Sequence, residues 1–308
     1  MSGLWTFVGR RVGHTVLVLF CVATVSFFIV RLAGDPVQQM LPPEATAEQE
    51  AALRASLGLD RPLLDQYLSY LGGLLRLDFG QSVFFHRPAF GVIMERLPLT
   101  VDLAVAAMAF TLVLAIPAGI VSAVRRGTAT DTSVMASVLV GQSTPAFWVG
   151  ILLILVFAVN LRWLPASGTG SPAHLVLPAI TLGLYSAAMI ARLLRSSLID
   201  VLGEDYIRTA RAKGLPGWRA VTSHGLRNAA LPVVTVVGLE VGSLLGGAIL
   251  TEQVFSWPGI GRLTVEAITY RDYPLMQATV LFLAAVFVLV NLIVDLSYAL
   301  LDPRVRLA

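Results

Sequence analysis

The chain has 308 residues, of which 56% are apolar and only 13% are charged, and its mean hydropathy is +0.78. This balance is typical of a membrane protein and excludes an ordinary soluble domain of this length. The formal net charge of +3 reflects an uneven distribution of basic residues along the chain and does not indicate a nucleic-acid partner. The single cysteine, Cys21, excludes an intramolecular disulfide.

Apolar runs long enough to cross a bilayer, which takes about 20 residues each, predict an all-α membrane protein with six transmembrane helices. The whole chain, residues 1–308, is then a single transmembrane domain. The predicted spans cover about residues 12–31, 100–124, 133–160, 174–194, 228–251 and 274–299.

Basic residues at the ends of these spans predict the orientation of the chain. With the N-terminus inside, the cytoplasmic segments hold 13 arginine and lysine residues, whereas the two short outer loops hold only Arg162, Arg262 and Arg271. We therefore expect both termini in the cytoplasm and residues 33–98 outside it.

The segment of residues 33–98 has the pattern of folded helices rather than of a linker. Thr46 and Gln49 form a capping box, and Gly58 is placed to end the first helix. Pro62 opens a second helix whose apolar residues recur at spacings of three and four. We expect this apolar face to pack on the outer ends of the spans, with contact to a partner, a substrate or the bilayer surface as the alternative.

The loop of residues 195–227 is the most informative part of the chain. Together with Arg192 it holds seven basic residues, among them the only lysine, Lys213. The run from Asp205 to Gly214 has the pattern of a short amphiphilic helix ended by a glycine. Seven charges exceed what orientation requires, which predicts a docking surface; a solvated loop that only sets the topology is the alternative.

Three acidic residues lie within the apolar spans, where a carboxyl group is costly. Asp102, near the outer end of the second span, is expected to cap its helix after Thr100. Glu240, near the middle of the fifth span, is a candidate for lining a pathway, with a buried structural hydrogen bond as an equal alternative. Asp295, near the inner end of the sixth span, is expected to pair with an arginine. The fifth span also has a small-residue face that permits close helix contact. That face consists of Gly238, Gly242, Gly246, Gly247 and Ser243.

The sequence offers no catalytic apparatus. A phosphate-binding loop needs a lysine between a glycine and a serine or threonine, whereas Lys213 lies between Ala212 and Gly214. The four histidines are too scattered for a metal cluster, and none lies deep in a span where it could activate a serine such as Ser143. We therefore expect no catalytic, metal-binding or cofactor-binding residues in this chain.

Short motifs of one known kind recur along nearly the whole chain. They are Gly34-Asp35-Pro36, Leu57 to Leu63 followed by Gln66-Tyr67, Asp78 to Ser82, Tyr206 to Gly214, Arg227-Asn228-Ala229, Glu252 to Gly261, Arg271 to Pro274, and Leu301 to Arg304. In this set the chain resembles the B-type permease subunits of the dipeptide, oligopeptide and nickel branch of type I ABC importers. The resemblance is specific for the branch and does not identify the substrate.

The coupling loop of such importers begins with Glu-Ala-Ala, which three further residues separate from a glycine. In this chain Arg208, Thr209 and Ala210 occupy the first three places, and Gly214 stands at the glycine. The leading acid is missing, but the helix–turn–helix geometry is expected to survive, with Gly214 in a left-handed turn and Pro216 at the start of a second helix. The resemblance implies that the ATPase-coupling residues are Arg208, Thr209, Ala210, Arg211, Lys213 and Gly214. Arg195 is expected to lie outside this contact.

The resemblance also implies partners and a place in the cell. A second, paralogous permease would complete a heterodimer, two ATPase subunits would hold ATP and Mg²⁺, and an extracytoplasmic binding protein would deliver the substrate. Short peptides are the expected substrate, with a nickel chelate, a metallophore or glutathione as alternatives. A self-contained channel or secondary carrier is the alternative from another class. The expected location is the bacterial inner membrane, in contact with lipid.

The orientation is tested by cysteine labelling in a Cys21→Ser background. Because residues 33–98 are expected outside, Ser56→Cys should react with a membrane-impermeant maleimide in spheroplasts, and Ser223→Cys should react only after lysis. Labelling at position 223 without labelling at position 56 would mean that the orientation is reversed.

Overall fold

The computed structural model describes residues 2–32, 37, 41, 46–56 and 58–301. Within them the chain is almost entirely helical, with one short antiparallel ribbon. In chain order the elements are α1 (Ser2–Leu32), α3 (Ala47–Ser56), α4 (Leu63–Leu75), β1 (Gln81–Ser82), β2 (Arg87–Pro88), α5 (Ala89–Val124), α6 (Ala129–Ser143), α7 (Ala146–Leu153), the π-helix η1 (Ile154–Asn160), α8 (Ala173–Leu202), α9 (Asp205–Ala212), α10 (Gly217–Arg219), the π-helix η2 (Ala220–Gly225), α11 (Leu226–Gly247), α12 (Ile249–Val254), α13 (Ile260–Thr269) and α14 (Tyr273–Leu301).

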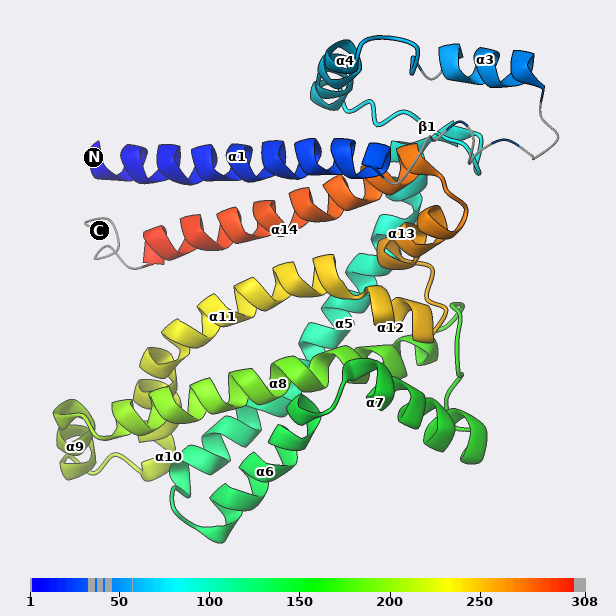
Figure 1. Ribbon diagram of the computed structural model, residues 1–308. Coiled ribbons are helices and arrows are strands. Elements are labelled where there is room, and N and C mark those ends of the chain that lie inside the picture. The colour runs from blue at the N-terminus through cyan, green and yellow to red at the C-terminus, as the bar shows by residue number, and fades with distance from the viewer. Residues whose placement is uncertain (1, 33–36, 38–40, 42–45, 57, 302–308) are drawn as a thin grey trace.

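Five helical segments are long and apolar enough to cross a membrane, and a bent pair makes a sixth crossing if it counts as one span. The five contain α1, α5, α8, α11 and α14, and the pair joins α6 to α7 and η1. The expected all-α membrane fold is thus confirmed. Figure 1 shows the start of α1, the end of α14 and α9 at one end of the molecule, here called the α9 end. Helices α3, α4, α12 and α13 lie at the opposite end, here called the α3 end.

The predicted third span is not one straight helix. Its two halves are bent by 102° at a break that contains Pro145, a residue that cannot donate a backbone hydrogen bond. The hydroxyl groups of Ser143 and Thr144 donate to the carbonyls of Leu139 at 3.2 Å and Val140 at 3.0 Å. These hydroxyl groups donate to backbone carbonyls close to the break in the helical hydrogen-bond ladder. Such side-chain hydrogen bonds reduce the free-energy cost of interrupting a helix within a membrane.

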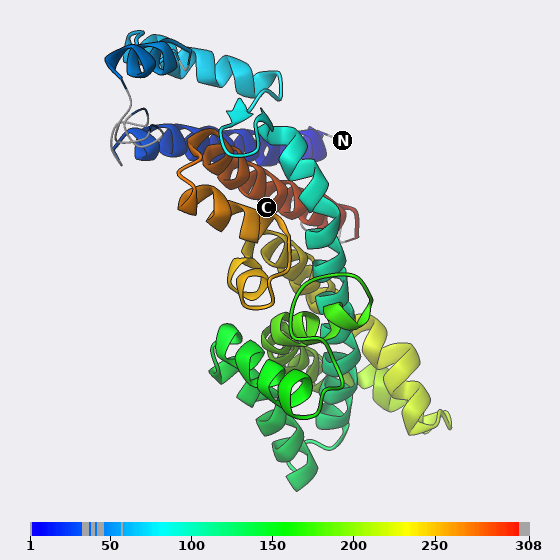
Figure 2. The same cartoon turned by 90° about the vertical axis from the view of Figure 1, so that its right-hand side faces the viewer.

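The second span starts earlier than its apolar run predicts. Helix α5 covers 36 residues and includes residues 89–98, which were expected in the outer segment. At about 1.5 Å per residue it is about 54 Å long, more than the hydrocarbon core of a bilayer requires. Figures 1 and 2 show α5 running from the layer of α1 and α14 to the layer of α6 and α8, so one helix holds both layers together.

Small residues allow α8 to approach α5 closely. A Cβ atom at Gly183 would lie 2.7 Å from the Phe110 ring and 2.8 Å from the Ala107 carbonyl. The Thr111 hydroxyl donates to the Gly183 carbonyl at 3.0 Å, and Thr111 is fully buried. This crossing fixes α8, and therefore the start of the loop that follows it.

The glycine face of α11 packs on α14, as its spacing predicts. A Cβ atom at Gly238 would lie 2.5 Å from the Val294 side chain, and Gly242 and Gly246 face Phe287 of the same helix. The close approach gains dispersion contacts that larger residues would prevent.

Helix α1 is held on the other side of α14. Asp295 forms an ion pair with Arg11 at 2.8 Å, which confirms that this acidic residue pairs with an arginine. The pair leaves no unmatched carboxylate at the end of the last span.

The helices before α5 form as their caps predict. The N–H of Gln49 donates to the Thr46 hydroxyl at 3.3 Å, and the N–H of Thr46 donates to Gln49 Oε1 at 3.0 Å. Gly58 has a φ of +64°, the left-handed conformation that ends a helix. The capping box and the glycine stop are thus both confirmed.

The apolar face of α4 is only partly covered. Tyr67 makes a hydrogen bond of 2.7 Å with the Thr24 hydroxyl of α1, and its ring lies 5.1 Å from that of Phe27. Leu64 and Leu68 are 66% and 56% exposed, so part of the face does not pack within the chain. Packing on a span, the first of the expected roles, therefore accounts for one edge of α4.

A buried carboxylate fixes the α3 end. The fully buried Glu252 accepts hydrogen bonds from Thr100 Oγ1 at 3.1 Å and from the N–H of Arg262 at 2.8 Å. The N–H of Gly261 donates to it as well, so the carboxylate caps the first turn of α13. Burial raises the pKa of the Glu252 carboxyl, and these hydrogen bonds oppose the rise.

Gly259 leaves the space that this carboxylate occupies. A Cβ atom at position 259 would overlap the Glu252 carboxyl group. The Thr100 hydroxyl also accepts the N–H of Ile260 at 2.8 Å, so α5 is bound to α12 and α13 together. A glycine is therefore required here by close approach and not by backbone conformation.

We expect Gly259→Ala to lower the thermal stability of the protein far more than Gly246→Ala. The added methyl group collides with Glu252 at position 259, whereas at position 246 the nearest atoms belong to Phe287 and lie 3.8 Å away. Overpacking costs about 1–3 kcal/mol, and displacing a buried carboxylate from its donors adds to that cost. The measurement is the melting temperature in detergent by fluorescence-detected size-exclusion chromatography. Equal melting temperatures would contradict the role given to Gly259.

Candidate functional site

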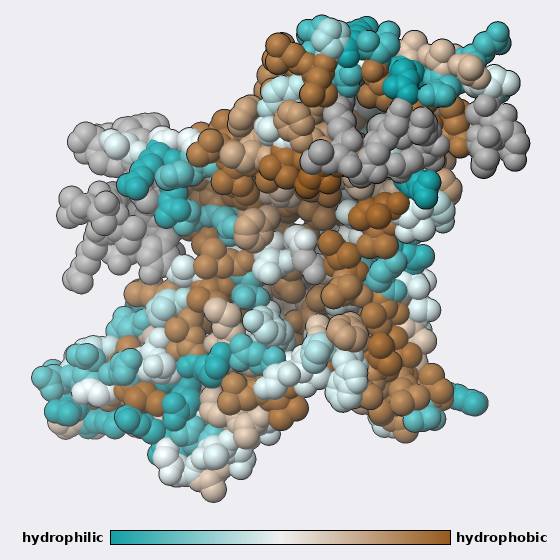
Figure 3. All heavy atoms as spheres, viewed as in Figure 1, coloured by the Kyte–Doolittle hydropathy of each residue, from teal (hydrophilic) through white to brown (hydrophobic). Residues whose placement is uncertain are grey.

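Helix α9 and the turn after it form the loop that the sequence singles out. Residues 195–202 of the expected loop are the last two turns of α8, so the connection itself begins at Gly203. Figure 1 shows α9 projecting beyond the ends of α8 and α11, and in Figure 3 mostly hydrophilic side chains cover this part of the molecule. The loop is therefore an exposed helical projection at the α9 end.

Gly214 ends α9 in a left-handed turn, as its position predicts. Its φ is +86°, and its N–H donates to the Arg211 carbonyl at 2.9 Å. The N–H of Leu215 donates to the Ala210 carbonyl at 3.1 Å, which completes a Schellman motif. Pro216 then precedes α10, so the expected helix–turn–helix geometry is confirmed.

The six predicted coupling residues form one accessible surface. All are exposed except Ala210, which is partly buried. A cavity of about 340 Å³ opens beside the turn. Its lining includes Ala210, Lys213, Gly214, Arg219 and His224.

Trp218 lies beside this surface, in contact with Arg219 of the cavity lining, and was not among the predicted residues. It is 64% exposed, and the guanidinium of Arg219 lies 5.2 Å from the centre of its ring. Exposed tryptophan and arginine side chains carry much of the binding energy at protein interfaces. The sequence signal that could have indicated Trp218 is an aromatic residue next to an arginine, within a loop of small and basic residues.

Helix α9 is anchored on α11 as well as joined to α8. Ile207 is its only buried residue in the described structure. The Tyr206 hydroxyl accepts a hydrogen bond of 2.8 Å from Asn228 Nδ2, on α11. The ion pair between Arg208 and Asp205 is highly exposed and adds little. A force on α9 therefore acts on both helices that flank the loop.

Glu240 does not lie with the coupling residues. It is partly buried on α11 and accepts a hydrogen bond of 2.5 Å from the Ser186 hydroxyl on α8. This contact joins two spans through polar groups, which have few other partners in a membrane. The structural hydrogen bond, one of the two interpretations of Glu240, is thus present, and a role in lining the pathway stays a prediction.

Arg195 is outside the surface of α9, as expected, but it is not a neutral position. Its guanidinium pairs with Asp131 of α6 at 2.7 Å, and only 7% of the Asp131 side chain is exposed. Removing Arg195 would leave a nearly buried carboxylate without its counterion, which is strongly destabilising. The sequence gives no signal for this pair, because its members lie 64 residues apart.

The surface around α9 has the chemistry of a docking site. Its guanidinium and ammonium groups suit carboxylates and backbone carbonyls of a partner. In the described part of the chain, no group of three or more His, Cys, Asp or Glu residues is placed to hold a metal ion.

Two family models together match almost the entire sequence. The binding-protein-dependent transport system inner membrane component matches residues 115–307, and the N-terminal membrane component of the same systems matches residues 4–104. The chain belongs to this family. The resemblance seen in the sequence motifs is thereby confirmed, and the chain is a permease subunit of a binding-protein-dependent importer.

Curated relatives agree with this assignment over their full length. The chain is 42% identical to the Di/tripeptide transport system permease protein DppB of Pseudomonas aeruginosa (strain UCBPP-PA14), over 98% of each chain. It is 41% identical to the Dipeptide transport system permease protein DppB of Escherichia coli (strain K12), over 97% of this chain and 98% of the relative. It is 44% identical to the Glutathione transport system permease protein GsiC of the same strain, with the same coverage.

Solved structures support the fold. A chain of the MetNI methionine ABC transporter, described in inward-facing conformations, matches with a TM-score of 0.58 and 19% identity, over 69% of this chain and 97% of that one. An amino acid ABC transporter with histidines matches with a TM-score of 0.50 and 16% identity. The expected type I importer fold is therefore confirmed, and at these identities the likeness concerns the fold alone.

Proposed function

We propose that this chain forms half of the translocation pathway of an ATP-driven importer of short peptides. The observation that carries the proposal is its 41–44% identity, over nearly the full length of both chains, to permeases of dipeptide, di/tripeptide and glutathione transport systems. Glutathione is the second candidate substrate, because the permease named for it is as similar as the dipeptide permeases. It is itself a tripeptide, so both candidates share one chemistry.

The ATPase subunits dock on α9 and the turn that ends it. The support is an exposed surface that combines basic groups, the aromatic Trp218 and the close-approach positions Ala210 and Gly214. Small residues let an opposing surface come near the backbone, and Arg211 and Lys213 supply donors to its carboxylates and carbonyls.

ATP-driven closure of the ATPase dimer draws the coupling loops of the two permeases together. In this chain α9 is continuous with α8 through a short connection and is tied to α11 by Tyr206 and Asn228. Because α9 is rigid and attached to both helices, its displacement is transmitted to α8 and α11 and is not absorbed within the loop. Glu240 and Ser186 join the same two spans farther from the loop, where we place the pathway.

A second, different permease supplies the other half of the pathway, ATP and Mg²⁺ are held by two ATPase subunits, and a binding protein delivers the peptide at the α3 end. The chain lies in the bacterial inner membrane with the α9 end in the cytoplasm, because 13 basic residues belong to the segments that the sequence assigns to that side.

The first test is reconstitution of the natively expressed complex in liposomes. We expect the chain to copurify with ATPase subunits and a paralogous permease, and the complex to import radiolabelled dialanine only with ATP and binding protein. Excess glutathione and a nickel chelate, added separately as competitors, distinguish the alternative substrates. ATP-independent uptake by this chain alone would sink the proposal.

The second test compares two glycines of the coupling loop. Gly214→Val forces a branched side chain into a left-handed backbone, which costs on the order of 1–2 kcal/mol, and adds bulk at the docking surface. Gly217→Val adds the same side chain three residues later, where φ is not in the left-handed range and the space is open. We expect Gly214→Val to release the ATPases or uncouple ATP hydrolysis from uptake, and Gly217→Val to be milder. Normal uptake in Gly214→Val would mean that the loop only sets topology.

A further inference from the structure

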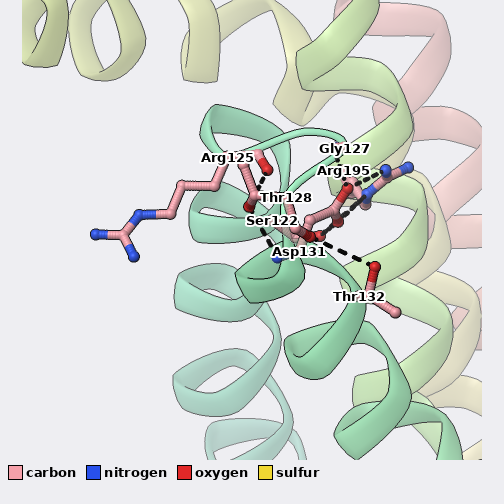
Figure 4. A network of polar contacts seen from close by, with 7 residues as sticks. All are labelled: Ser122, Arg125, Gly127, Thr128, Asp131, Thr132 and Arg195. Atoms are coloured by element: carbon pink, nitrogen blue, oxygen red, sulfur yellow. Dashed lines mark hydrogen bonds and ion pairs between the residues drawn. The ribbon is translucent and has the colours of Figure 1, made fainter.

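One carboxylate joins three helices near the start of the coupling loop (Figure 4). Asp131, in the first turn of α6, accepts hydrogen bonds from Arg195 Nε at 2.8 Å and from Arg195 Nη2 at 2.7 Å. Its remaining donors are the Ser122 hydroxyl on α5 and the N–H of Gly127 at 2.9 Å. Both oxygens are thus fully engaged, and the guanidinium binds them as a fork.

The network is largely withdrawn from solvent. Asp131 is 5% exposed and Ser122 is fully buried, whereas the Arg195 side chain keeps 31% of its surface accessible. A bidentate ion pair in such a place fixes distance and angle between its helices far more tightly than an exposed pair does.

The network lies close to the start of the coupling loop, so its rigidity affects how α9 is attached to the spans. From Arg195 the helix α8 continues through about two turns to Leu202, and α9 follows after two residues. The other contacts of α6 and α5 with this part of α8 come mainly from alanines and other apolar residues. Apolar contacts hold helices together, but because they have no direction they specify the angle and register between two helices less tightly than a bidentate ion pair does.

Helix α6 also lacks the support of a straight span. It meets the following helix at 102° beyond Ser143, so its position depends on its contacts with α5 and α8, which run from Asp131 to Gly141, packed against Leu184. The Asp131 carboxylate is the polar contact that fixes the start of α6 to α8.

We propose that Asp131 is a positioning residue for energy coupling. It locks the α9-end halves of α5 and α6 to α8, so that a displacement of α9 moves the three helices as one body. The proposal rests on the importer function given above. If the lock is broken, the ATPases still bind α9, but α8 slides on α6 and the motion does not reach the pathway.

The experiment measures dialanine imported per ATP hydrolysed in the reconstituted complex. Asp131→Asn keeps the shape of the side chain and removes its charge, and Arg195→Lys keeps the charge and removes the fork. Arg126→Gln is the matched control, because Arg126 is exposed in the turn between α5 and α6 and makes no ion pair within the described part of the chain. We expect about a tenfold lower ratio in Asp131→Asn, a smaller loss in Arg195→Lys and the parent ratio in the control.

A double substitution separates coupling from general damage. Asp131→Asn combined with Arg195→Gln should lower the ratio no further than the worse single variant, because both changes remove the same lock. Losses that multiply would show two independent roles and would overturn the proposal. If Asp131→Asn fails to assemble, Arg195→Lys and Ser122→Ala decide the matter, and unchanged ratios in both overturn it.

Spin labels provide a readout that does not depend on transport. In a Cys21→Ser background, labels at Ser133→Cys on α6 and Ser196→Cys on α8 should keep one distance in the nucleotide-free and ATP-trapped complexes. In Asp131→Asn the distance should change between the two states or broaden. A parent complex without ATP-driven uptake would refute the importer function and this inference together. A coupled parent whose Asp131→Asn variant is equally coupled, or whose label distance changes between states, would refute the inference alone.

Discussion

Hydrocarbon offers no hydrogen-bond partner, so each polar group within the spans of this chain has to be satisfied by the chain itself. The structure meets much of this constraint with contacts between helices that are distant in sequence, whereas Asn291 Oδ1 on α14 is buried without a hydrogen-bond partner in the described part of the chain. Glu240 receives the Ser186 hydroxyl, and Asp295 receives Arg11. Each contact therefore satisfies a polar group and also fixes one span against another. The same few polar residues that make the chain costly to insert determine how its apolar helices are arranged.

Local patterns were the predictable part of the fold. A capping box such as that of Thr46, or a glycine stop such as Gly214, involves residues within one turn, and both formed as expected. The presence of the spans followed from apolar length, although α5 begins at Ala89, earlier than its apolar run predicts. The 102° bend in the third span was not predictable in the same way, because Pro145 allows a kink but does not set its angle. That angle depends on what α6 and α7 touch elsewhere.

The candidate site likewise has one part that could be predicted from the sequence and another part that could not. The coupling surface lies within one continuous stretch, so the sequence could identify its residues and its helix–turn–helix geometry. The groups that hold the surrounding helices are 64 residues apart for Arg195 and Asp131, and 152 residues apart for Glu252 and Thr100. A single sequence carries no record of such pairing. It showed the carboxyl groups of Glu240 and Asp295 within spans without identifying the partner residue of either, and it did not single out Asp131 or Glu252.

The two ends of the molecule use a similar device for different purposes. At the α3 end, the Glu252 carboxylate binds backbone N–H groups at the start of α13 and a hydroxyl from α5. At the α9 end, the Asp131 carboxylate binds the N–H of Gly127, a hydroxyl from α5 and the guanidinium of Arg195. Helix α5 contributes to both sites, and its 36 residues connect them without a break. A displacement that reaches α5 through Asp131 therefore has a continuous helical path to the opposite end, where α12 and α13 are attached.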